Sequence, residues 1–167
     1  PIGISFYTLE AISYLVDVFR GKIQADKKLS RLALYLAFFP QVMEGPIARY
    51  EETAMQIYRG DKLQYHNICF GFQRIFYGLM KKMIVADRLN IIVKNIFLHY
   101  ADYNGGVLLL GVIFYTIQLY MDFSGVMDVV IGTGEIFGVK LPENFRQPFF
   151  AKNISDFWAR WHITLGT

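Results

Sequence analysis

His162 is the histidine whose neighbours most favour chemistry. It directly follows Trp161, comes four residues after Trp158, and shares a predicted helix with Arg160. Indole rings lower the polarity around an imidazole and favour its uncharged form, which is the form that a general base needs. The spacing alone leaves two interpretations open, a histidine packed at an interface and a general base.

Carboxylates inside apolar segments are the second group of candidates, because charge at membrane depth is costly unless it faces protein or water. Glu44 lies beside Gly45 and Pro46, where a regular helix is not expected to continue, so we predict that it faces a pore or a site. Glu10 and Asp17 lie seven residues apart and suit polar helix packing as well as chemistry. The paired carboxylates of the stripe described next are a further candidate, but no histidine accompanies them at a matching spacing, so we expect no metal site.

A stripe of polar residues and glycines follows the longest apolar run. Its members are spaced three or four residues apart, which places them on one helical face: Gln118, Asp122, Gly125, Asp128, Gly132 and Glu135. Such a stripe packs closely against a neighbouring helix or borders an aqueous channel. Arg74, Lys81 and Arg88 recur every seven residues, which suits either contact with lipid headgroups or a basic lining for an anionic acyl carrier or phosphate.

The composition indicates a protein of the lipid bilayer. Of 167 residues, 54% are hydrophobic and 19% are charged, whereas soluble domains carry roughly 25% charged residues. These values exclude a disordered chain and a chain that coats nucleic acid. The net charge of +3 is too small to indicate a nucleic-acid partner, and the sequence pI of about 9.0 fits a protein lying against anionic lipid headgroups.

The hydrophobic pattern predicts an all-α, multi-pass transmembrane protein. Residues 103–121 carry no charge and are long enough to span a bilayer, and residues 2–19 are a second candidate span. Residues 32–47 are predicted to form a broken or re-entrant segment, residues 50–65 an interfacial element, and a last helix is expected to start at Ser155. The chain starts at Pro1 and stops inside an amphipathic stretch, so we interpret residues 1–167 as one partial domain of a longer protein.

Several sequence blocks resemble the membrane-bound O-acyltransferase (MBOAT) family, in its bacterial branch. They occur in the order that the family shows and extend over nearly the whole chain: residues 1–14, 38–50, 120–125, 141–145 and 155–165. His162 matches the histidine of the family's Trp-His motif, which is associated with catalysis. Ala159 departs from the pattern, because arginine is frequent there in relatives.

The resemblance implies an enzyme of the bacterial cytoplasmic membrane that moves an acyl group to a hydroxyl on a cell-envelope polymer or carrier. His162 is the implied catalytic residue, and a second functional histidine is expected beyond Thr167. The shared motifs add residues that suit substrate binding, a tunnel or a structural role: Glu44, Asp122, Ser124, Trp158, Arg160 and Trp161. Acetyl-CoA or an acyl-carrier thioester is expected as a substrate rather than a bound cofactor, and a periplasmic or extracellular acetyltransferase is the expected protein partner.

Three functions remain open at the level of the sequence. Residues 43–47 favour acetylation of a polysaccharide, whereas D-alanyl transfer to teichoic acid is the alternative within the same family. A membrane scaffold or transport subunit without chemistry also explains intramembrane carboxylates and a broken helix. The Trp-His block together with the Pro-Glu-Asn-Phe loop favours an enzyme over a transporter.

The basic loop at residues 20–31 is predicted to lie on the cytoplasmic side, where lysine and arginine accumulate. In a cysteine-free version of the complete gene product, which includes Cys69→Ser, the substitution Lys27→Cys tests this orientation. The new thiol should react with a membrane-impermeant maleimide only after the cells are opened. Efficient labelling of intact cells would contradict the orientation.

Overall fold

Helices make up the regular structure of the part of the chain described here. The structure is a computed structural model that describes residues 4–40 and 44–166. Its helices follow in the order α1 (Ile4–Phe19), α2 (Leu29–Leu36), α3 (Tyr50–Arg59), α4 (Tyr65–Met80), the π-helix η1 (Lys81–Ala86), α5 (Asp87–Leu98), the 3₁₀ helix η2 (Tyr100–Asp102), α6 (Gly105–Ile136), the 3₁₀ helix η3 (Pro148–Phe150), α7 (Ile154–Trp158) and α8 (Ile163–Gly166). Within these residues one antiparallel bridge joins Phe145 to Trp161. The predicted all-α class is confirmed for these residues.

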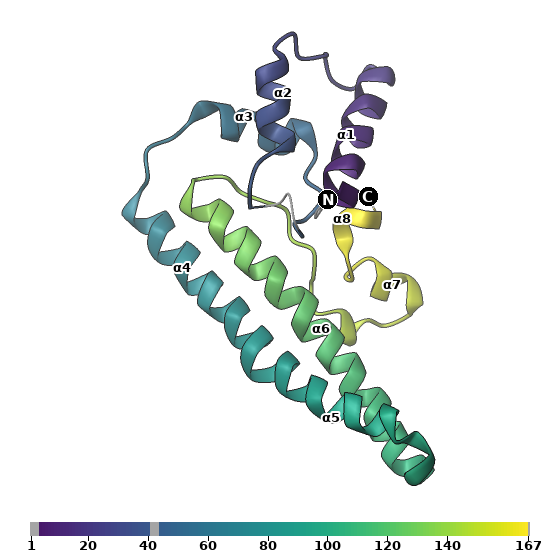
Figure 1. Cartoon of the computed structure of the whole chain (residues 1–167). Helices are drawn as coiled ribbons and strands as arrows, with labels where there is room; N and C mark the ends of the chain where they lie inside the picture. The colour runs from purple at the N-terminus through teal and green to yellow at the C-terminus, as the bar shows by residue number, and fades with distance from the viewer. Residues whose placement is uncertain (1–3, 41–43, 167) are drawn as a thin grey trace.

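Two groups of helices form the architecture (Figure 1). The run α4–η1–α5 lies alongside α6 and leads into it through η2, so the two long elements form an antiparallel pair. Helices α1, α2 and α3 gather near the end of the pair where α4 begins and α6 ends. The short helices α7 and α8 lie on the side of α6 away from α4, and the last of them ends near the start of α1.

Helix α6 is the element that suits a bilayer. It begins at Gly105, where the side chain of Asn104 accepts a hydrogen bond from the backbone N of Val107 at 3.0 Å, and it continues beyond the predicted span to Ile136. Its most apolar window has a mean hydropathy of 1.6 and is largely exposed, as expected for a lipid-facing surface. Among the described residues α6 alone has the length and hydropathy of a spanning helix; α1, the other candidate, has 16 residues.

Close contact between α4 and α6 depends on two pairs of glycines. A Cβ atom on Gly78 would lie 2.4 Å from the backbone O of Gly125, and one on Gly71 would lie 2.6 Å from the backbone O of Gly132. The reciprocal Cβ positions are equally crowded, at 2.8 Å and 2.7 Å from the opposing oxygens. Small residues let helix backbones approach closely in this way. Close packing, one of the two interpretations of the polar and glycine stripe, is therefore confirmed for its glycines.

Arg74 and Lys81 both form ion pairs with α6. The guanidinium of Arg74 donates two hydrogen bonds of 3.1 Å to Oδ1 of Asp128, and Nζ of Lys81 lies 2.6 Å from Oδ2 of the same carboxylate. Arg74 also forms a two-pronged pair with Glu143, with both N–O distances at 2.6 Å. These ion pairs give Arg74 and Lys81 a role that the spacing did not predict, because their partners lie far away along the sequence.

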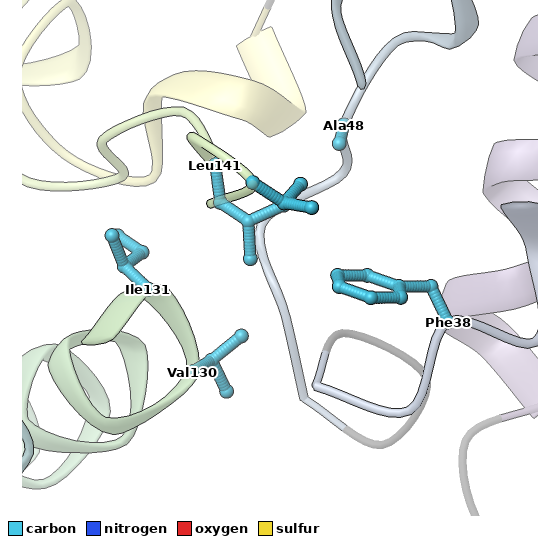
Figure 2. Close-up of a cluster of buried hydrophobic side chains, with 6 residues drawn as sticks. Phe38, Ala48, Val130, Ile131 and Leu141 are labelled. Atoms are coloured by element: carbon cyan, nitrogen blue, oxygen red, sulfur yellow. The ribbon is translucent and has the colours of Figure 1, made fainter. Parts of the chain in front are cut away.

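The segment between α2 and α3 is not a regular helix in its described part. Helix α2 ends at Leu36, Pro40 lies in a turn, and residues 44–49 lack regular structure, while residues 41–43 fall outside the described part of the chain. Side chains from both flanks of this segment pack on the end of α6 and on the residues after it (Figure 2): Phe38, Ala48, Val130, Ile131, Val139 and Leu141. This cluster fixes residues 44–49 next to the functional elements described below.

Replacement of Gly78 by alanine should destabilise the α4–α6 pair. Overpacking costs about 1–3 kcal/mol, which exceeds the roughly 0.5–1 kcal/mol that alanine gains over glycine within a helix. Gly105→Ala is the control, because nothing lies within 4 Å of the added Cβ. The thermal unfolding midpoint of the complete gene product in detergent should fall for Gly78→Ala and not for Gly105→Ala. Equal midpoints for the two variants would show that the close approach is unnecessary.

Candidate functional site

His162 lies in a break between two short helices. Helix α7 ends at Trp158 and α8 begins at Ile163, and the backbone of His162 has a left-handed conformation with φ of +47°. The prediction of one helix starting at Ser155 and containing His162 is therefore wrong. The N-cap is Asn153, whose side chain accepts a hydrogen bond of 2.8 Å from the backbone N of Asp156. The predicted N-cap, Ser155, lies two residues after the observed one, because either side chain can cap a helix.

Backbone pairing with residues 144–146 holds this break in place. The N of Arg146 donates to the O of Arg160, and the N of Ile163 donates to the O of Asn144, each at 3.0 Å. These bonds lie on either side of the Phe145–Trp161 bridge. The loop that follows α6 therefore fixes the backbone of His162 from both sides.

The ring of His162 packs against Phe123 of α6. The two ring centroids lie 4.9 Å apart and the planes meet at 75°, an edge-to-face contact. The predicted indole walls are not found. Trp158 is 62% exposed, and Trp161 packs with Tyr120, Phe145, Phe149 and Phe157. The prediction failed because it assumed helical spacing through the break.

Burial favours the uncharged imidazole of His162. It lowers the pKa of His162, and the contact of the ring with its own backbone opposes this effect only in part. Its Nδ1 is buried and has no hydrogen-bond partner among the described residues. The cation predicted beside it is otherwise engaged, since Nε of Arg160 lies 2.7 Å from Oδ1 of Asp156 and lowers the pKa of that carboxyl. The imidazole of His162 therefore lies in surroundings of low polarity, and Arg160 forms its ion pair with Asp156 instead.

A cavity of about 470 Å³ lies on α6, where Phe123 forms part of its wall. Its walls come from α6, η1 and the irregular segment before α3: Glu44, Lys82, Leu119, Asp122, Phe123 and Val126. Nζ of Lys82 lies 2.7 Å from Asp122 and 2.9 Å from Asp87. Phe123 contacts His162 and also lines the cavity, so it links the two parts of the candidate site.

Two consecutive lysines of the π-helix η1 both bind α6. Lys81 pairs with Asp128, and Lys82 pairs with Asp122. π-turns of this kind occur frequently at functional sites.

Only some of the other predicted residues lie at the cavity. Glu44 and Asp122 meet at the cavity, whereas Ser124 is buried with an Oγ that has no partner among the described residues. Arg160 and Trp161 support the break through their backbones, and Trp158 lies apart. Within the described residues, no three His, Cys, Asp or Glu side chains are grouped so that they could hold a metal ion.

Four residues of the site carried no role in the sequence analysis: Lys82, Phe123, Asn144 and Thr164. Asn144 is 1% exposed, and its Oδ1 accepts from the backbone N and the Oγ1 of Thr164 at 3.0 and 2.9 Å. Its place in the Pro-Glu-Asn-Phe loop was a signal for importance, but the pairing with Thr164 depends on the tertiary fold.

Comparisons with known proteins agree with this arrangement of motifs. The family described as MBOAT, membrane-bound O-acyltransferase family, matches residues 23–167. The chain is 40% identical over 167 residues to "Probable alginate O-acetylase AlgI" of Pseudomonas syringae pv. tomato. The aligned region covers 100% of this chain and 32% of that protein. It is 35% identical over 199 residues to "Peptidoglycan O-acetyltransferase" of Helicobacter pylori, covering 99% of this chain and 36% of the relative.

A third relative carries a different name. "Teichoic acid D-alanyltransferase" of Bacillus subtilis is 32% identical over 169 residues, covering 98% of this chain and 42% of that protein. The chain spans about a third of the length of the alginate O-acetylases that it matches. Because the family match extends over most of the residues, from before α2 to the region of His162, the chain belongs to the membrane-bound O-acyltransferase family.

Proposed function

We propose that this chain forms part of a multi-pass enzyme of the bacterial cytoplasmic membrane that moves an acetyl group onto hydroxyls of a cell-envelope polysaccharide. The placement of His162 carries the proposal. Its imidazole is half-buried on a fixed backbone and contacts Phe123, which lines the cavity. The name of the alginate relative, at 40% identity, supports acetyl as the group transferred.

In the proposed reaction, His162 is the general base. Its uncharged imidazole removes the proton of the accepting hydroxyl while the hydroxyl oxygen attacks the carbonyl carbon of an acyl thioester. A C–O ester bond forms, the C–S bond breaks, and the leaving thiolate takes up a proton. Because burial lowers the pKa of His162, the imidazole is uncharged at neutral pH and ready for this step.

We assign the cavity beside Phe123 to a substrate in the same proposal. Lys82 offsets the charge of Asp122, and Glu44 lies at the same cavity, so the walls suit hydroxyl and amide groups rather than a strongly charged ligand. Ser124 follows Phe123 on α6, and its buried hydroxyl has no hydrogen-bond partner in the described part of the chain. Arg160 and Trp161 have a supporting role, and no binding role is proposed for Trp158.

The donor in this proposal is acetyl-CoA or an acyl-carrier thioester, and it acts as a substrate. A periplasmic or extracellular acetyltransferase is the proposed partner that completes transfer to the polymer. The second functional histidine expected beyond Thr167 would complete the site. D-alanyl transfer to teichoic acid is the second candidate, favoured by the relative that is named for that reaction at 32% identity.

His162→Gln in the complete gene product should lower acyl transfer about 10²- to 10⁴-fold, because glutamine keeps polarity and loses basicity. The measurement is the rate at which alkali-labile ester accumulates on the cell envelope, divided by the amount of folded protein. Acetate among the released products supports the first candidate, and D-alanine supports the second.

His66→Gln is the matched control, because His66 is exposed at the start of α4 and contacts Phe70 only at the surface. It should leave ester formation near the wild-type rate. Near-normal transfer by folded His162→Gln would show that His162 is a packing residue. That result is expected if this chain is a scaffold that carries out no chemistry itself.

A further inference from the structure

Asn144 makes hydrogen bonds that go beyond the support of its own loop. Its backbone O accepts from Ile163, and its Oδ1 accepts from both the backbone N and the Oγ1 of Thr164, at distances of 2.9–3.0 Å. Ile163 and Thr164 are the two residues that directly follow His162. Asn144 therefore binds the chain immediately after the proposed base.

Thr164 extends this connection to a third segment. Its Oγ1 accepts a hydrogen bond of 3.0 Å from the backbone N of Ile47, which belongs to the irregular stretch that carries Glu44. One threonine hydroxyl thus joins the loop after α6, the segment before α3 and the turn of His162. Both the base and one wall of the cavity depend on the same small group of bonds.

These hydrogen bonds stabilise an unfavourable backbone conformation at His162. A left-handed backbone is unfavourable at a residue other than glycine, and His162 adopts φ of +47°. Strained conformations of this kind persist only where the surrounding structure fixes them. The ring direction of His162 follows from that backbone, so loss of the bonds would let the imidazole leave its place against Phe123.

Asn144 is itself held firmly. Its side chain is 1% exposed, and its Nδ2 donates to the sulfur of Met127 on α6 at 3.3 Å. The residue before it, Glu143, is bound by both arms of the Arg74 guanidinium. Asn144 therefore offers Thr164 an acceptor whose position is set by α4 and α6.

We propose that Asn144 is a positioning residue, which acts through Thr164 to hold the imidazole of His162 at the reacting atoms. This inference rests on the proposed role of His162. It assigns Asn144 and Thr164 no contact with substrate. Their contribution is geometric, and a displacement of about 1 Å at a reacting group can lower a rate about 100-fold.

Two pairs of variants of the complete gene product test the inference, with ester formation measured per folded, monodisperse protein. Thr164→Val keeps the side-chain volume and loses the hydroxyl, whereas Thr164→Ser keeps the hydroxyl. Asn144→Ala is compared with Asn104→Ala, which removes a hydrogen-bonding asparagine at the far end of α6. We expect a fall of about 10- to 100-fold for Thr164→Val and Asn144→Ala, and near wild-type rates for Thr164→Ser and Asn104→Ala.

The other outcomes overturn the inference. Wild-type rates per folded molecule in Thr164→Val and Asn144→Ala would show that the bonds serve stability alone, and so would a complete absence of folded protein for both. Equal losses in Thr164→Ser and Thr164→Val would exclude the hydroxyl as the cause. His162→Gln, measured alongside, separates the two proposals: if it stays active, the proposed base fails, and if it alone is inactive, only the role of Asn144 fails.

Discussion

The ion cluster around Arg74 is the interaction on which the arrangement of this chain depends. One guanidinium binds Asp128 of α6 and Glu143 of the following loop, while Lys81 binds the other oxygen of Asp128. Lys81 and Asp128 are nearly enclosed, with side-chain exposures of 11% and 13%. Removal of one partner from a buried pair costs about 3–5 kcal/mol, so these charges fix α4, η1, α6 and the loop relative to one another, and glycines at the α4–α6 contact permit the short distance.

A short series of contacts connects this cluster to the proposed base. Glu143 holds the loop, Asn144 binds Thr164, and the bridge at Phe145 and Trp161 flanks His162. Charges, backbone pairing and one buried amide thus share the task of keeping a strained turn in place. Lys82 of the π-helix η1, which packs against α6, pairs with Asp122 at the cavity.

Local pattern was sufficient to predict the apolar span, the glycine face of α6 and the break around Pro40, because each depends on residues close together in sequence. It failed where the partner is distant. Arg74 and Lys81 were interpreted by their spacing, but Asp128 decides their role. The neighbours of His162 were predicted on the assumption of one continuous helix, whereas pairing with residues 144–146 interrupts that helix. Lys82, Phe123 and Thr164 gave no signal for the same reason, since nothing local marks a contact made across the fold.

A structure of the complete gene product with bound S-acetonyl-pantetheine would show directly whether His162 lies at the reacting atoms. This probe mimics an acetyl thioester on the arm shared by coenzyme A and acyl carriers. We expect the ketone of this probe to lie beside the imidazole of His162, next to Phe123, with the Asn144–Thr164 bonds intact. A probe bound elsewhere, with the imidazole of His162 enclosed by protein and out of its reach, would contradict this expectation.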